Sequence, residues 1–166
     1  MFALTIISAI AGLKVGKYIF PVEDLRLNGS AYAIPVQNET LYFNLFGTVN
    51  STEHCGASEL GDNLTAYTAS SLEDLDLCFP VAMNGTEEVH LIQKNPRANP
   101  TGLHIMYNGT AGSDSALSIT LNCHRLSTMN VTRGFDFVYN LTINHPAGCP
   151  KQPRQKMMTT RDQWYF

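Results

Sequence analysis

Charged residues and long apolar segments are both scarce in this chain of 166 residues. Only 15% of the residues are Asp, Glu, Lys or Arg, and the formal net charge is -3. A weakly negative chain offers little attraction to a polyanion, so we expect no nucleic-acid partner. No apolar run reaches 18 residues, so we expect no membrane-spanning helix here, and a membrane anchor of any parent protein would lie outside this chain.

The sequence also lacks the motifs that carry catalysis or hold cofactors. It contains no G-x-S-x-G, no H-E-x-x-H and no P-loop. A zinc site is the competing interpretation for the cysteines, because His54 precedes Cys55 and His124 follows Cys123. No Cys-x-x-Cys or His-x-x-x-His spacing supports zinc. We therefore expect a protein that is not an enzyme and that needs no cofactor or metal.

Acceptor patterns for N-linked glycans are abundant. With 13 Asn and 25 Ser or Thr in 166 residues, chance predicts about two N-x-S/T patterns, and the chain has eight. Such an excess favours a secreted or luminal glycoprotein. The acceptor asparagines are Asn28, Asn38, Asn50, Asn63, Asn84, Asn108, Asn130 and Asn140.

Four cysteines fit the same oxidising compartments. Four cysteines allow three pairings. Cys55–Cys78 with Cys123–Cys149 is the simplest, since each pair brackets a compact segment. Each such loop would add roughly 3 kcal/mol of stability by the chain-entropy estimate.

Three regions follow from composition. Residues 1–15 are mostly apolar and include the small-x-small triplet Ala9-Ile10-Ala11, so they are a signal remnant or a leader strand. Residues 16–152 are expected to form one β domain. Residues 153–166 have a mixed, moderately basic composition and are interpreted as a tail or linker.

Alternating apolar residues predict strands along most of the domain. One face of the expected strand 116–123 carries Leu117, Ile119 and Leu121, and strand 134–143 has the same alternation. A Pro-rich turn excludes helix at 95–102, and 70–77 is the one short helical candidate. Turn residues every 8 to 15 positions predict an all-β fold, a flattened antiparallel barrel or sandwich. The expected strands are 17–22, 32–36, 39–47, 89–93, 102–107, 116–123 and 134–143.

In order and spacing, these segments resemble a mannose 6-phosphate receptor homology domain, the P-type lectin fold. The resemblance runs from about Gly16 to Cys149 and is closest to repeats of the cation-independent receptor and its insect relatives. It implies that Cys123–Cys149 links the last two strands. The segments that carry it are GKYIFPVEDLRLNGSAY, LYFNLFG, LCFP, GLHIMYNGT, ALSITLNC and FDFVYNLTINHPAGC.

The chain departs from this family at the sugar-binding positions. The family holds mannose through a Gln, an Arg, a Glu and a Tyr. The Gln position matches Phe79, the Arg position falls at Ser115 or Ala116, and the Glu position falls near Met129. Only the tyrosine remains, at Tyr139. Because one missing buried hydrogen-bonding group costs about 1–3 kcal/mol, three losses predict that mannose recognition is abolished.

Three functions remain open at this stage. The first, which the resemblance implies, is a structural or protein-binding module of a Golgi, endosomal or lysosomal sorting receptor or of a related luminal or cell-surface glycoprotein. Its partner would be a protein ligand or a neighbouring receptor repeat. The second is a carbohydrate-binding lectin with a rearranged pocket, for which Arg125 and Gln93 are candidate residues. The third is an unrelated glycosylated sandwich of an adhesion or viral surface protein. An immunoglobulin-like version would link Cys55 or Cys78 to Cys123.

Overall fold

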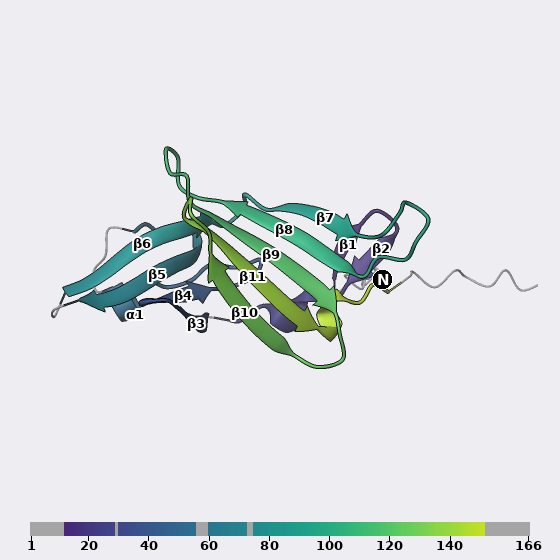
Figure 1. Cartoon of the computed structure of the whole chain (residues 1–166), viewed down its shortest axis with the longest axis horizontal. Coiled ribbons are helices and arrows are strands. Elements are labelled where there is room, and N and C mark those ends of the chain that lie inside the picture. The colour runs from purple at the N-terminus through teal and green to yellow at the C-terminus, as the bar shows by residue number, and fades with distance from the viewer. Residues whose placement is uncertain (1–11, 29, 56–59, 73–74, 152–166) are drawn as a thin grey trace, which may run out of the picture.

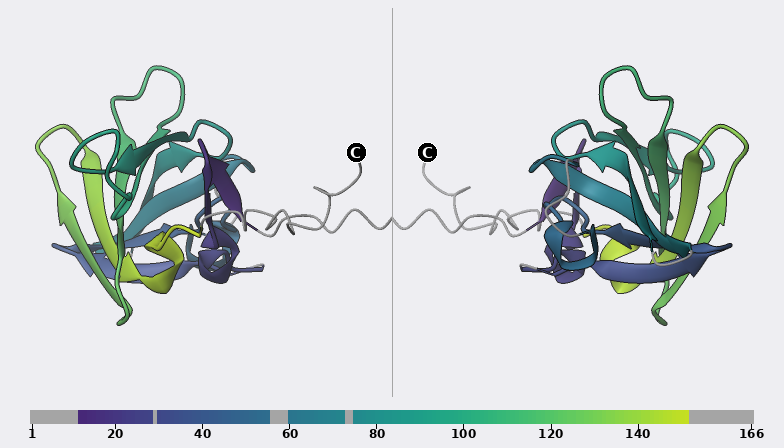
Figure 2. Two further views of the ribbon diagram at one scale, coloured as in Figure 1. Left: turned by 90° about the vertical axis from the view of Figure 1, so that its right-hand side faces the viewer. Right: turned by 90° about the vertical axis from the view of Figure 1, so that its left-hand side faces the viewer.

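The computed structural model describes residues 12–28, 30–55, 60–72 and 75–151, and these residues form an all-β sandwich. Two larger sheets, of five and four strands, pack against each other beside a two-stranded sheet (Figures 1 and 2). The expected sandwich is therefore confirmed, whereas the described strands form no closed barrel. Residues 1–11 of the proposed leader and the proposed tail at 153–166 lie outside the described residues.

The four-stranded sheet is an antiparallel meander in the order β3-β4-β5-β6. Two residues, Gln37 and Asn38, connect its first two strands, and Gln37 has a φ of 54°. A positive φ at the first residue suits a tight hairpin turn that follows the twist of the flanking strands. The strands are β3 (Tyr32–Val36), β4 (Glu39–Phe43), β5 (Leu64–Leu72) and β6 (Leu75–Met83).

The five-stranded sheet has the order β10-β11-β9-β8-β7. Its strand β11 runs parallel to β9, with Tyr139 beside Leu117. This one parallel pair departs from the antiparallel arrangement that the sequence predicted. The reason is that the chain leaves β9, forms the edge strand β10 and returns between the two. The strands are β7 (Glu88–Ile92), β8 (Gly102–Asn108), β9 (Ala116–Cys123), β10 (Thr128–Arg133) and β11 (Val138–His145).

Short elements seal one end of the sandwich. The strands β1 (Leu13–Val15) and β2 (Tyr18–Phe20) form a hairpin, and the 3-10 helices η1 (Val22–Leu25) and η2 (Pro146–Gly148) pack together. A Cβ on Gly148 would lie 2.7 Å from the carbonyl carbon of Asn122. Only glycine allows so close an approach of the two backbones.

The core lies between the two larger sheets. Leu117, Ile119 and Leu121 are fully buried, as the alternation in β9 predicted. In β4 and just after it, Leu41, Phe43 and Leu45 are likewise buried. The period of two therefore identified the inward faces correctly.

The alternation misled at residues 134–137, which the sequence assigned to the last strand. This segment is instead the turn between β10 and β11, closed by the Gly134 N–H, which donates to the Val138 carbonyl at 2.8 Å. Phe135 is fully exposed, and Phe137 has a φ of 55°. A left-handed residue interrupts an extended strand, so the apolar alternation here continued past the end of the strand.

Two other local expectations also need correction. The short helix expected at 70–77 is the tip of the β5–β6 hairpin, with residues 73–74 outside the described set. A different segment, Thr52–Cys55, forms the single-turn helix α1. Serine, aspartate and glutamate suit either a helix start or a hairpin end, so local composition did not separate the two.

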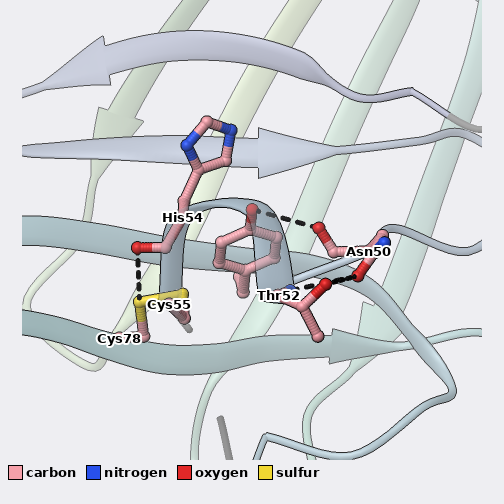
Figure 3. The surroundings of a disulfide bond; sticks show 6 residues. Asn50, Thr52, His54, Cys55 and Cys78 are labelled. Atoms are coloured by element: carbon pink, nitrogen blue, oxygen red, sulfur yellow. Dashed lines mark hydrogen bonds between the residues drawn. A yellow bond between two sulfur atoms is a disulfide. The ribbon is translucent and has the colours of Figure 1, made fainter. Parts of the chain in front are cut away.

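The disulfides are Cys55–Cys78 and Cys123–Cys149, which confirms the expected pairing. The first joins α1 to β6, as Figure 3 shows, and the second joins the end of β9 to the residue after η2. Disulfide-bonded sulfurs are not thiolate ligands, so the zinc interpretation of the cysteines is excluded. The immunoglobulin-like link to Cys55 or Cys78 is also contradicted.

Two disulfides indicate an oxidising environment, secretory or extracellular. Among the described helices, none is long and apolar enough to cross a membrane.

Candidate functional site

A cavity of about 1010 Å³ opens at the end of the sandwich opposite η1 and η2. The β5–β6 hairpin extends past the five-stranded sheet at this end (Figure 1). The walls come from the β3–β4 turn, from β5 and β6, from the loop between β8 and β9, and from the β10–β11 turn. Residues far apart in the sequence thus meet at one opening.

Polar side chains replace apolar ones on the inward faces at this end. In β4, Glu39 lies on the same face as Leu41 and Phe43, because side chains alternate along a strand. In β5, Thr68 pairs with Leu41 and points the same way. The strand faces that form the apolar core therefore become hydrophilic at their outer ends.

Three side chains form the floor of the cavity. The Tyr139 hydroxyl donates to Glu39 Oε1 at 2.5 Å, and Arg133 Nη1 lies 3.3 Å from the same oxygen. The Glu39 side chain is 11% exposed and that of Arg133 is 29% exposed. Burial and the bond to Glu39 raise the pKa of Tyr139 to about 12, so this hydroxyl keeps its proton at physiological pH.

Aromatic rings hold the Arg133 guanidinium from its sides. Its central carbon lies 4.9 Å from the ring centroid of Phe137 and 5.8 Å from that of Tyr139. These distances suit cation–π attraction. The cation therefore has a fixed place beside the carboxylate while keeping N–H groups for a ligand.

The rim is apolar and open. Phe79 and Phe137 are each 57% exposed, and Leu77 is 40% exposed. Inside, the buried Thr68 hydroxyl lies near the Tyr139 hydroxyl and opposes the rise in its pKa, but it forms no hydrogen bond of normal geometry. An unsatisfied buried hydroxyl is costly unless something supplies the missing bond. A ligand with hydroxyl groups would supply it.

The structure brings together three of the four positions that the family resemblance marked. Tyr139, Phe79 and Ser115 all line the cavity. Met129 does not line it and packs against the core instead. Arg125 and Gln93, the candidates for a rearranged pocket, are not among the lining residues either.

Sequence reasoning missed Gln37, Glu39 and Arg133, which all line this cavity. Glu39 is 100 residues from Tyr139 in the sequence, and no local motif links them. One signal was available, because an acidic residue on the apolar face of a strand is unusual. Glu39 precedes Leu41 and Phe43 at this spacing.

Metal ligation finds no support in the described part of the chain. It contains no group of three or more His, Cys, Asp or Glu side chains arranged to hold an ion. The charged partner of Glu39 is Arg133.

The acceptor asparagines lie at the surface, as glycosylation requires. Seven are exposed and Asn84 is half-buried. At Asn50, the Thr52 hydroxyl of the same pattern donates to the asparagine Oδ1 at 2.7 Å (Figure 3). On the outer face of β10 and β11, Asn130 pairs with Thr142 and Asn140 pairs with Thr132. Attachment of glycans at these sites stays a prediction.

Comparison of the sequence with protein-family models and with curated proteins gave no match. The site must therefore be interpreted from its own chemistry.

Proposed function

We propose that this protein is a non-catalytic carbohydrate-binding module that holds its ligand in the cavity between the β5–β6 hairpin and the β10–β11 turn. The observation that carries this proposal is the Glu39–Tyr139–Arg133 network in an open cavity with an aromatic rim. Sugars present hydroxyl groups around the ring and apolar C–H faces above and below it. The cavity offers complementary groups for both.

Each floor residue has a distinct role in this proposal. The Glu39 carboxylate accepts hydrogen bonds from sugar hydroxyls through the capacity that Tyr139 and Arg133 leave free. Arg133 donates to sugar oxygens, or to a phosphate if the sugar carries one. Phe79 and Phe137 pack against the C–H face of the ring. The Thr68 hydroxyl gains a hydrogen bond of normal geometry.

The types of residue also agree with the family resemblance. A P-type lectin site uses a Gln, an Arg, a Glu and a Tyr, and the cavity contains Gln37, Arg133, Glu39 and Tyr139. Apart from the tyrosine, they come from positions that the sequence pattern did not mark. This supports the rearranged-pocket alternative over a module that has lost its sugar site.

The wider biological setting follows from the same proposal. A disulfide-bonded lectin-like module with eight glycan acceptor patterns suits a glycoprotein of the secretory pathway. We place it in a sorting receptor or a related glycoprotein of the Golgi, endosome or lysosome lumen, or of the cell surface. In such a protein the cavity would bind high-mannose or phosphomannosyl glycans.

A glycan array tests the proposal directly. The folded, glycosylated protein is applied at pH 6.5 and at pH 5 to an array containing high-mannose and mannose 6-phosphate glycans. The matched variant Glu39→Gln keeps the size of the side chain but removes its charge. A hydrogen bond to a charged group contributes about 1.5–3 kcal/mol, so we expect the variant to bind roughly 10- to 100-fold more weakly.

The control is Glu88→Gln, on the exposed edge strand β7, which should bind like the wild type. Equal loss in both variants would point to a general charge effect. Absence of binding by the wild-type protein to every glycan on the array would refute carbohydrate recognition by this cavity.

A protein-binding module is the second candidate, and one observation favours it. Leu77, Phe79 and Phe137 form an exposed apolar rim, and exposed apolar patches often mark protein contacts. Replacing Phe79 by Ser should then abolish capture of a co-purified receptor fragment while Glu39→Gln leaves it unchanged. In the glycan-binding assay, the carbohydrate proposal expects the opposite order, with a larger loss of binding for Glu39→Gln than for Phe79→Ser.

A further inference from the structure

One predicted glycan attachment site lies at the candidate pocket itself. Among the eight acceptor asparagines, all of which are described, Asn38 is the one that lines the cavity. It is exposed and forms the second residue of the tight β3–β4 turn. The other seven attachment sites have no place in the lining.

The acceptor pattern and the pocket also share a residue. The pattern is Asn38-Glu39-Thr40, and its middle residue is the carboxylate that binds Tyr139 and Arg133. Asn38 and Glu39 are adjacent in the chain and both line the cavity, so a glycan on Asn38 would start at the edge of the proposed site. Asn38 also borders a second, shallower hollow of about 610 Å³ on the outer side of the sheet. The attachment point therefore lies on the ridge between the two hollows.

We propose that an N-linked glycan on Asn38 lies across the mouth of the cavity and regulates access to it. The inference rests on the proposed carbohydrate-binding function, because the same groups that would hold a free sugar would hold this tethered one. The glycosylated chain would then carry a built-in competitor. Copies without this glycan would be the ones with an open site.

Tethering makes even a weak sugar contact effective. A short flexible tether gives an effective concentration in the millimolar range. If the tethered sugar binds with a dissociation constant equal to that concentration or up to about tenfold below it, the apparent affinity for a free sugar falls by roughly 2- to 10-fold. The rim residues Phe79 and Phe137 line the same cavity as Asn38, so they are available to contact this glycan.

The test uses the full chain from a glycosylating host and two variants that remove the attachment by different routes. Asn38→Gln removes the acceptor, and Thr40→Ala removes the recognition of the acceptor while keeping Asn38. Thr40→Ser keeps the pattern and is the matched control. Asn130→Gln removes a glycan from the outer face of β10, away from the cavity. Peptide mass spectrometry gives the occupancy of each site.

Binding of methyl α-mannoside and of a free high-mannose oligosaccharide is then measured by calorimetry. We expect Asn38→Gln and Thr40→Ala to bind 2- to 10-fold more tightly than the wild type. Thr40→Ser and Asn130→Gln should match the wild type. In the wild-type protein, native endoglycosidase digestion should release the Asn38 glycan several-fold more slowly than the Asn130 glycan.

The outcomes separate the two proposals. Equal binding with and without the Asn38 glycan, or an Asn38 that is never occupied, overturns the regulatory inference and leaves carbohydrate binding intact. Absence of binding in every form, including Asn38→Gln, overturns the proposed function and the inference together.

Discussion

The two ends of the sandwich are made from the same strands but differ in chemistry. At the end with η1 and η2, the inward side chains are apolar, and Leu25, Ile143 and Ala147 are fully buried. At the other end the inward side chains of Glu39 and Thr68 are polar and border a cavity of about 1010 Å³. The closed end supplies stability, and the open end is the one at which we propose that a ligand binds.

The way in which the strands end explains why one end of the sandwich is closed and apolar while the other is open and polar. At the closed end, short 3-10 helices and the Cys123–Cys149 disulfide fill the space between the sheets. At the open end, the long β5–β6 hairpin extends beyond the facing sheet, so its inner face has no apolar partner (Figure 1). Glu39 is tolerated there because Arg133 and Tyr139 pair with its carboxylate.

The largest predicted effect is a loss of stability after a substitution at the closed end. Ile143→Ala removes a fully buried side chain and should lower the free energy of unfolding by about 2–5 kcal/mol. Phe79→Ala, at the open rim, should change it by no more than about 0.5 kcal/mol, because the ring is largely exposed. Urea unfolding of both variants measures the contrast. Similar losses in the two would show that the rim is part of the core.

Removal of each disulfide is the next comparison. The sequence separations are 23 and 26 residues, so the chain-entropy estimate gives a similar contribution of roughly 3–3.5 kcal/mol for either one. Replacing both cysteines of a pair by serine should therefore cost nearly the same in each case, as judged by thermal unfolding. A much larger loss for Cys123–Cys149 would show that sealing the closed end adds packing energy beyond loop closure.

A smaller effect on stability, with a large effect on binding, is expected at Tyr139. Tyr139→Phe keeps the buried ring but removes the hydroxyl that donates to Glu39. We expect a loss of about 1–3 kcal/mol in stability and roughly tenfold weaker glycan binding. Calorimetry with a high-mannose oligosaccharide measures the second quantity. Unchanged binding would remove Tyr139 from the site.

Alkaline pH gives the smallest and most selective test. The pKa values of Tyr67 and Tyr139 are raised to about 12, mainly by burial, against about 10 in an unfolded chain. A raised pKa means that the folded state favours the protonated hydroxyl. This contribution is therefore fully present below about pH 10 and is lost as the pH rises toward about 12.

Urea unfolding between pH 8 and pH 11.5 measures that loss. Tyr139→Phe should lose part of the pH dependence, because one of the raised groups is gone. An identical pH dependence in the variant and the wild type would mean that Tyr139 ionises normally in the folded protein.

The sequence predicted the fold better than the site. Period-two alternation identified the buried faces of β4 and β9, and the cysteine spacing identified both disulfides. The same alternation failed at Phe135 and Phe137, because a turn can continue an apolar pattern by coincidence. The parallel pairing of β9 and β11 depends on a crossover that no local pattern encodes.

Prediction of the site from the sequence was limited by distance along the chain. Tyr139 was identified through a family resemblance, whereas Glu39 and Arg133 were not. Their contact joins residues 94 apart in the sequence, and only the packing of two sheets brings them together. A residue-by-residue match to the family pattern therefore counted three ligands as lost, while the cavity contains side chains of the same types from other strands.

The most direct measurement is a backbone amide NMR titration of the folded protein with a high-mannose oligosaccharide. The account predicts dose-dependent shifts at Glu39, Ser70, Ser115, Arg133 and Phe137, which line the cavity, and none at Leu25, Ile143 or Ala147. Shifts confined to the closed end, or no shifts at saturating ligand, would contradict the claim that the open end is the ligand site.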